Sequence, residues 1–251
     1  MIRACYICVM QWLPNLLTIS NAFFGCLSLI FIHNYNLDLI TILITASLLC
    51  DLFDGYLARK IGSDGEIGKH LDSLADMISF GVVPGAIITK IAYSLGSPIF
   101  FLGFFITLGS LYRLAKFNTE KSNSNYFTGL PTPANSLMIL GIAWAIQEYN
   151  LFQNISNDQP LINSMFSILF IVTITLSVYV MNSSLQIMSF KWIPKHKEQL
   201  MSRMIYAIIS VILLIIFKAT AFALIIPLLI LFSLIEKKLF KSKNYEIPSR
   251  N

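Results

Sequence analysis

Four aspartates lie close together in the first third of a chain of 251 residues. Asp51 and Asp54 are three residues apart, and Asp72 and Asp76 are four apart, all within 26 residues. On helices, these spacings place each pair on one helix face. Residues 59–67 supply the turn between the two helices. The sequence therefore predicts that both carboxylate pairs meet across one helical hairpin.

Four carboxylates at close range repel one another unless cations lie between them. Hard divalent ions such as Mg²⁺ or Mn²⁺ prefer oxygen ligands of this kind. Two such ions about 4 Å apart can bind both ends of a phosphoryl displacement. One aspartate can then take the proton of an attacking alcohol. We therefore expect two divalent ions, bound by Asp51, Asp54, Asp72 and Asp76.

Small residues and one arginine accompany the aspartates. Gly55, Ala58 and Gly68 lie on or beside the same helix faces, where a missing or short side chain lets a nucleotide approach the backbone. Arg59 can bind a phosphate through its planar guanidinium. This combination indicates a site for a phosphorylated ligand next to the metal ions.

The elements that position these residues are membrane helices. The chain is 56% hydrophobic and only 12% charged, with a mean hydropathy of +0.70, whereas soluble domains carry roughly 25% charged residues. Eight apolar runs approach the length needed to cross a bilayer. The expected spans are 17–33, 37–58, 67–95, 99–117, 134–148, 162–181, 204–217 and 221–235.

Basic residues divide the connections between these spans into those that contain Lys or Arg and those that contain neither. Lys and Arg follow the second, fourth, sixth and last spans, as in Arg59, Lys60 and Lys69 or in Arg113, Lys116 and Lys121. The connections 34–36 and 147–160 contain neither. By the positive-inside rule, both termini and the aspartate end of the hairpin face the cytoplasm. The expected localisation is a bacterial inner membrane, with the active site on the cytoplasmic side.

The aspartate motif resembles the signature of the CDP-alcohol phosphotransferases. It reads Asp51-x-x-Asp54-Gly55-x-x-Ala58-Arg59, then eight residues, then Gly68-x-x-x-Asp72-x-x-x-Asp76. The resemblance covers residues 14–191 and implies a six-helix membrane core. We therefore expect an all-α polytopic membrane helix bundle that forms a single domain over 1–251, with about two additional C-terminal spans at 204–236.

The resemblance also implies roles for particular residues. The four aspartates would bind the metals, and Asp76 would also accept the proton. Gly55, Ala58, Arg59 and Gly68 would contact the CDP group of a CDP-activated lipid. Pro14-Asn15-x-x-Thr18 resembles the segment that such enzymes place beside the cytidine, so Asn15 and Thr18 are expected at the same site.

Four segments resemble the phosphatidylserine synthase branch of the family. They lie at 71–84, 112–118, 127–134 and 189–191. The branch implies CDP-diacylglycerol and L-serine as substrates and phosphatidylserine as product. Serine has a carboxylate, which needs a cation, and Arg113 or Lys116 at the end of the fourth span could supply it.

Two alternatives remain open at this stage. The acceptor could be glycerol 3-phosphate or inositol phosphate, although a phosphorylated acceptor would require more cationic residues. The chain could instead be an ion-coupled transporter, but such proteins place their ion sites near the bilayer midplane. A basic face with interleaved aromatic residues is missing, so no nucleic-acid partner is expected. Membrane lipid and a second copy of the chain, forming a homodimer, are the other partners considered.

Overall fold

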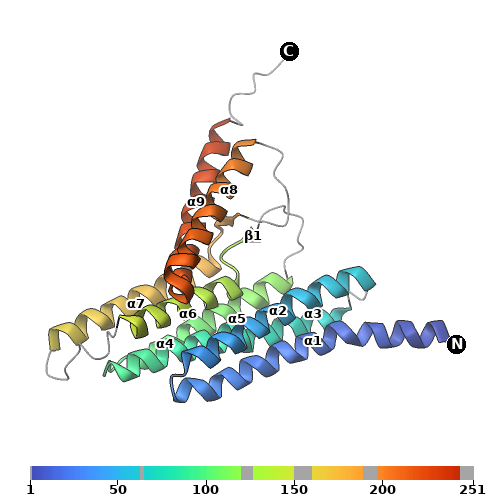
Figure 1. Ribbon diagram of the computed structural model, residues 1–251, viewed down its shortest axis with the longest axis horizontal. Coiled ribbons are helices and arrows are strands. Elements are labelled where there is room, and N and C mark those ends of the chain that lie inside the picture. Colours follow the sequence, from blue (N-terminus) through green and yellow to red (C-terminus); the bar gives the residue numbers. More distant parts are fainter. Residues whose placement is uncertain (1, 63–64, 120–126, 150–159, 189–196, 244–251) are drawn as a thin grey trace, which may run out of the picture.

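The computed structural model of the protein describes residues 2–62, 65–119, 127–149, 160–188 and 197–243. These residues are almost entirely helical, and helices account for all eight expected spans in their expected order (Figure 1). The elements are α1 (Ile2–His33), α2 (Leu37–Ile61), α3 (Glu66–Asp76), η1 (Met77–Val82), α4 (Val83–Ser94), η2 (Phe100–Gly103), α5 (Phe104–Thr119), β1 (Phe127–Thr128), α6 (Thr132–Glu148), α7 (Pro160–Asn182), β2 (Gln186–Ile187), α8 (Lys197–Phe217), η3 (Lys218–Ala221) and α9 (Phe222–Lys243).

Tight turns join the first helices into antiparallel hairpins. Tyr35 adopts a left-handed conformation with φ 51°, and the Asn36 side chain caps α2 by accepting a hydrogen bond from the Leu39 N–H at 3.2 Å. Gly62 ends α2 with φ 70°, a conformation that glycine adopts without steric cost. As a result α1 packs along α2, and α3 packs against α1.

The third span is one continuous helix that changes its winding in the middle. α3 passes directly into the π-helical segment η1 and then into α4. Pro84 lacks the N–H that would bond to the Phe80 carbonyl, so regular α-helical winding is interrupted here. Phe80, Val83 and Ile88 on this helix are buried. The central position of this helix holds its aspartate end firmly within the bundle.

Large apolar side chains cover the outside of the bundle. Ile42 is 62% exposed and Ile215 is 75% exposed, which would be unfavourable in water and is favourable in lipid. Five segments of the described chain are long and apolar enough to cross a membrane, and the last of them contains both α8 and α9. The protein is therefore a multi-pass membrane protein with an all-α fold, as the composition predicts.

Hydrogen bonds at the two ends of the bundle show which helix ends lie together. At the aspartate end, the Lys69 ammonium donates to the Asn118 carbonyl of α5 at 3.0 Å. At the opposite end, Ser97 and Ser167 hydroxyls lie 2.9 Å apart. Lys69, Arg113 and Lys116 thus share one end, as the distribution of basic residues predicts. Lys121 and the segment 189–191 lie outside the described residues.

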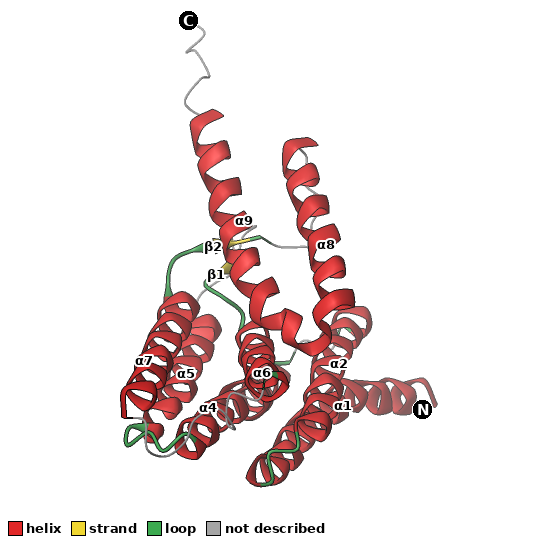
Figure 2. Ribbon diagram, turned by 60° about the vertical axis from the view of Figure 1, so that its left-hand side comes forward, coloured by secondary structure: helices red, strands yellow, loops and turns green. Residues whose placement is uncertain are grey.

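The bounds of three helices and one arrangement differ from the sequence-based expectation. α1 begins at Ile2 rather than near residue 17, and it continues through Pro14. α8 and α9 are also longer than expected, and their hairpin rises at a steep angle from the other helices (Figures 1 and 2). The Thr220 hydroxyl at its tip donates to the Glu148 carboxylate of α6 at 2.8 Å, which anchors the hairpin to the core.

A short two-stranded ladder closes the aspartate end. Phe127 pairs with Ile187, and Thr128 pairs with Gln186. Gly129 follows with φ 73°, and its N–H donates to the Leu185 carbonyl at 2.8 Å. A side chain at Gly129 would strike the Met181 carbonyl oxygen. The segment therefore forms a tight turn against the end of α7.

Candidate active site

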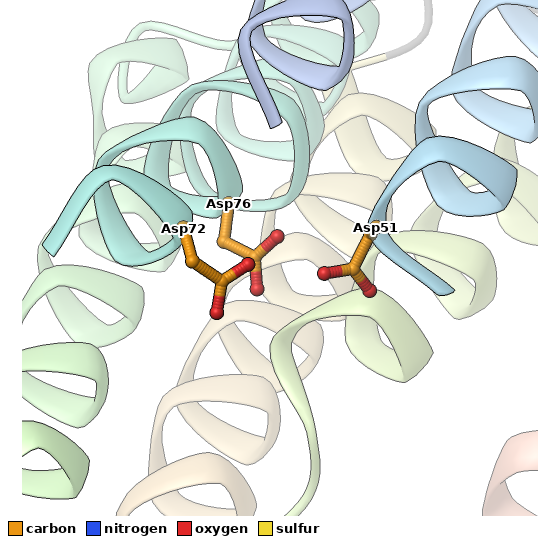
Figure 3. A group of neighbouring side chains, drawn as sticks. All are labelled: Asp51, Asp72 and Asp76. Atoms are coloured by element: carbon orange, nitrogen blue, oxygen red, sulfur yellow. The ribbon is translucent and has the colours of Figure 1, made fainter. Parts of the chain in front are cut away.

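Three of the four aspartates come together between α2 and α3. One carboxylate oxygen each from Asp51, Asp72 and Asp76 lies within 4.8 Å of the other two. Figure 3 shows the three carboxylates turned toward one another, with Asp51 on one helix and Asp72 and Asp76 on successive turns of the other. The hairpin therefore produces the gathering of carboxylates that the helical spacing predicts.

Asp54 lies outside this group of three. It is 5% exposed, and one of its carboxylate oxygens accepts a hydrogen bond from the Thr18 hydroxyl at 2.5 Å. Thr18 belongs to α1, so this bond joins the first helix to the aspartate end of α2. The sequence predicted both residues for the site, but only the fold brings them into contact.

A cavity of about 350 Å³ opens beside the aspartates. Asp54 and Asp72 both line it, so Asp72 belongs to the cavity and to the group of three carboxylates. All six residues expected to contact the CDP group also line this cavity: Asn15, Thr18, Gly55, Ala58, Arg59 and Gly68. The cavity is large enough for part of a nucleotide, and its position puts a bound pyrophosphate next to the carboxylates.

The Arg59 guanidinium folds back along α2 toward Gly55, where an added Cβ would lie 3.4 Å from Nη1. Lys69, which the distribution of basic residues assigned only to membrane topology, lines the same cavity. Two cations therefore border the cavity beside the carboxylates of Asp54, Glu66 and Asp72. Each cation can bind a phosphate group.

Asn21 is a site residue that the sequence analysis missed. It is fully buried on α1, and its side-chain Nδ2 donates to Asp76 Oδ1 at 3.2 Å. Its position three residues after Thr18 would place both on one face of a helix, which is a signal the sequence does contain. Only the packing of α1 against α2 and η1 shows that this face meets Asp76.

Arg113 and Lys116 line a small cavity of about 20 Å³ next to Thr128. This volume holds about one water molecule and is too small for an amino acid. The Arg113 Nε donates to the Met181 carbonyl at 3.2 Å, and Nη2 donates to the Gly129 carbonyl at 3.5 Å. Arg113 therefore joins α5 to the end of α7 and to the turn at Gly129.

The donor set suits a hard divalent cation. Every ligand atom in the group of three is a carboxylate oxygen, the type that Mg²⁺ and Mn²⁺ prefer. Asp51, Asp72 and Asp76 would hold one ion. A second ion would need Asp54 together with Asp72, which both border the cavity. The group of three therefore fits one divalent ion, and the second ion of the two-ion expectation stays a prediction.

The fold and the site define a membrane helix bundle with a carboxylate cluster beside a cavity bordered by cations. The sequence profile of the CDP-alcohol phosphatidyltransferases matches residues 11–179. The chain therefore belongs to the CDP-alcohol phosphatidyltransferase family. The match ends before the α8–α9 hairpin.

Several curated relatives share the part of the chain that contains the site. The CDP-diacylglycerol–serine O-phosphatidyltransferase of Saccharomyces cerevisiae is 38% identical over 114 residues, 42% of this chain and 41% of that protein. The archaetidylserine synthase of Methanothermobacter thermautotrophicus is 37% identical over 129 residues, 51% of this chain and 55% of that protein. The CDP-diacylglycerol–serine O-phosphatidyltransferase of Bacillus subtilis is 32% identical over 125 residues, 49% of this chain and 71% of that protein. The matched region thus spans about half or less of the first two relatives.

Proposed function

We propose that this protein transfers the phosphatidyl group of CDP-diacylglycerol to L-serine, forming phosphatidylserine and CMP. The strongest support is that Asp72 lines the cavity and also belongs to the group of three carboxylates. A pyrophosphate bound in the cavity would lie within reach of the metal ligands. The relatives are named as serine phosphatidyltransferases or as an archaetidylserine synthase, which favours serine as the acceptor.

The proposed reaction is a single displacement at phosphorus. The serine hydroxyl oxygen bonds to the β-phosphorus of CDP-diacylglycerol. The bond from that phosphorus to the bridging oxygen breaks, and CMP leaves with the electron pair. Asp76 accepts the hydroxyl proton. Bound divalent ions would neutralise the charge on the pyrophosphate oxygens, while Arg59 and Lys69 hold the nucleotide side.

The same geometry supports a cytoplasmic site. Arg59, Lys60 and Lys69 surround the aspartate end of the bundle, and cytoplasmic loops are rich in such residues. A soluble nucleotide product and a soluble amino acid would exchange on that side. We therefore propose a bacterial inner membrane location with the cavity open to the cytoplasm. A homodimer remains a prediction.

An acceptor panel tests the proposed function. Purified protein is mixed with CDP-diacylglycerol and Mg²⁺, and CMP release is measured with serine, ethanolamine, glycerol 3-phosphate or inositol phosphate. Serine is expected to drive release, and ethanolamine, which lacks the carboxylate, is expected to be poor. CMP release with glycerol 3-phosphate would be consistent with the family but would contradict serine as the acceptor. No release with any of these acceptors would overturn the proposed transfer reaction.

A conservative change at Arg113 tests the proposed acceptor site. Arg113→Lys keeps the charge but loses the planar fork that binds a carboxylate. The Michaelis constant for serine is expected to rise by about ten- to a hundredfold, since one charge-assisted bond contributes roughly 1.5–3 kcal/mol. The constant for CDP-diacylglycerol should change little, because Arg113 does not line its cavity.

Arg113 also holds the turn at Gly129, so a matched control is needed. Ser110 lies one turn earlier on α5 and contacts the Met181 side chain across the same helix interface. Ser110→Ala should loosen that interface without removing a cation. If both variants raise the Michaelis constant for serine equally, Arg113 acts on the fold and not on the acceptor.

A further inference from the structure

Asn21 is surrounded by three helices at the centre of the bundle. Its side chain is fully buried, and buried polar groups are retained in membrane interiors only with partners. Nδ2 donates to Asp76 Oδ1 at 3.2 Å. Oδ1 accepts a hydrogen bond from the Ser47 hydroxyl of α2. The amide therefore connects α2 to the Asp76 carboxylate.

The Ser47 hydroxyl determines which way the amide faces. It lies closer to Asn21 Oδ1 than to the Asn21 backbone carbonyl, which is 3.0 Å away, so its single proton goes to Oδ1. Ser79 of η1 donates separately to the backbone carbonyl at 2.9 Å. Nδ2, which carries the amide protons, must then face Asp76 and donate to its carboxylate.

Close packing of α1 against η1 makes this contact reachable. Gly25 is one turn beyond Asn21, and a Cβ there would lie 3.0 Å from the Ser79 Cα. Only a glycine lets the two backbones approach this closely. The π-helical segment begins at Met77, directly after Asp76. Such segments commonly occur at functional sites, where they change the direction of a side chain.

We propose that Asn21 is a positioning residue that holds Asp76 in the orientation needed for metal binding and proton acceptance. This inference rests on the proposed function. The amide donates to one oxygen of the carboxylate, which stops rotation of that group and directs the other oxygen toward Asp51 and Asp72. Ser47 acts indirectly, because its hydrogen bond to Oδ1 prevents the Asn21 amide from exchanging the positions of its oxygen and nitrogen.

Three alanine variants of the full-length protein test this role. Asn21→Ala is expected to lower kcat by about ten- to a hundredfold, as is typical when an outer partner of a metal ligand is lost. Ser47→Ala removes one hydrogen bond and should lower kcat roughly fivefold. Ser79→Ala is the matched control, because Ser79 is equally buried but its hydroxyl donates to the Asn21 backbone carbonyl and not to the side-chain amide; its kcat should stay close to wild type.

Two further measurements separate positioning from a general loss of structure. The Michaelis constant for CDP-diacylglycerol should stay unchanged in all three variants, because other residues line the cavity. Mn²⁺ affinity, measured by electron paramagnetic resonance without substrate, should weaken in Asn21→Ala and not in Ser79→Ala. If Asn21→Ala fails to fold, Ser47→Ala against Ser79→Ala gives the same comparison.

The outcomes distinguish this proposal from the proposed function. Wild-type kcat and Mn²⁺ affinity in Asn21→Ala would overturn the positioning role, as would equal losses in Ser47→Ala and Ser79→Ala. If the wild-type protein uses another acceptor, serine as the acceptor is contradicted. The three variants then still test the role of Asn21, with that acceptor in the assay. If the wild type releases no CMP, the Mn²⁺ affinities alone decide the role of Asn21.

Discussion

Asp76→Asn is expected to abolish phosphatidyl transfer, with kcat falling by roughly 100- to 10,000-fold, the range for loss of a general base. Asparagine has nearly the same size but cannot accept the serine proton, and it removes one charge from the metal ligands. Its amide oxygen can still accept the hydrogen bond from Asn21 Nδ2. The variant should therefore fold normally and bind CDP-diacylglycerol, because Asp76 does not line the cavity.

Asp38→Asn is a suitable control for this experiment. Asp38 is an exposed carboxylate in the first turn of α2, at the end of the bundle opposite the site. Its replacement should leave CMP release unchanged. Both variants are compared by CMP release with saturating serine, and by binding of a CDP-diacylglycerol analogue. Turnover near the wild-type rate in Asp76→Asn would remove Asp76 from the mechanism.

Removal of divalent ions is expected to stop the reaction completely. Treatment with EDTA should end CMP release, and added Mg²⁺ or Mn²⁺ should restore it, because carboxylate oxygens of Asp51, Asp72 and Asp76 are gathered within 4.8 Å of one another. Ion removal should also lower the melting temperature, since the carboxylates then repel one another. A ligand at 100 times its Kd stabilises the folded state by about 2.7 kcal/mol.

Asp51→Asn serves as the paired variant for the metal experiment. It removes one ligand and one charge, so Mn²⁺ should raise its melting temperature much less than that of the wild type. The metal-free variant should be at least as stable as the metal-free wild type, because repulsion in the cluster is reduced. Full activity of the wild type after exhaustive chelation would refute the metal hypothesis.

The short-range features of this protein, its helices and the spacing of residues along them, could be predicted from its sequence. Helix periodicity is a short-range property, so spacings of three and four residues are sufficient to place Asp51 with Asp54 and Asp72 with Asp76. Hydropathy identifies the spans, because a helix in lipid must satisfy its backbone internally and expose apolar side chains. The short link between α2 and α3 then predicts that the two pairs meet, and three of the four aspartates, Asp51, Asp72 and Asp76, do so.

Contacts between distant helices were decided by tertiary packing alone. The bond from Thr18 to Asp54, the bond from Asn21 to Asp76 and the use of Arg113 to hold the turn at Gly129 all join separate helices. Each depends on how two helix faces rotate and how closely they approach, as at Gly25 beside Ser79. The steep angle of the α8–α9 hairpin is of the same kind. Hydropathy is nearly uniform around membrane helices, so it leaves these rotations open, and small residues and buried hydrogen bonds determine them.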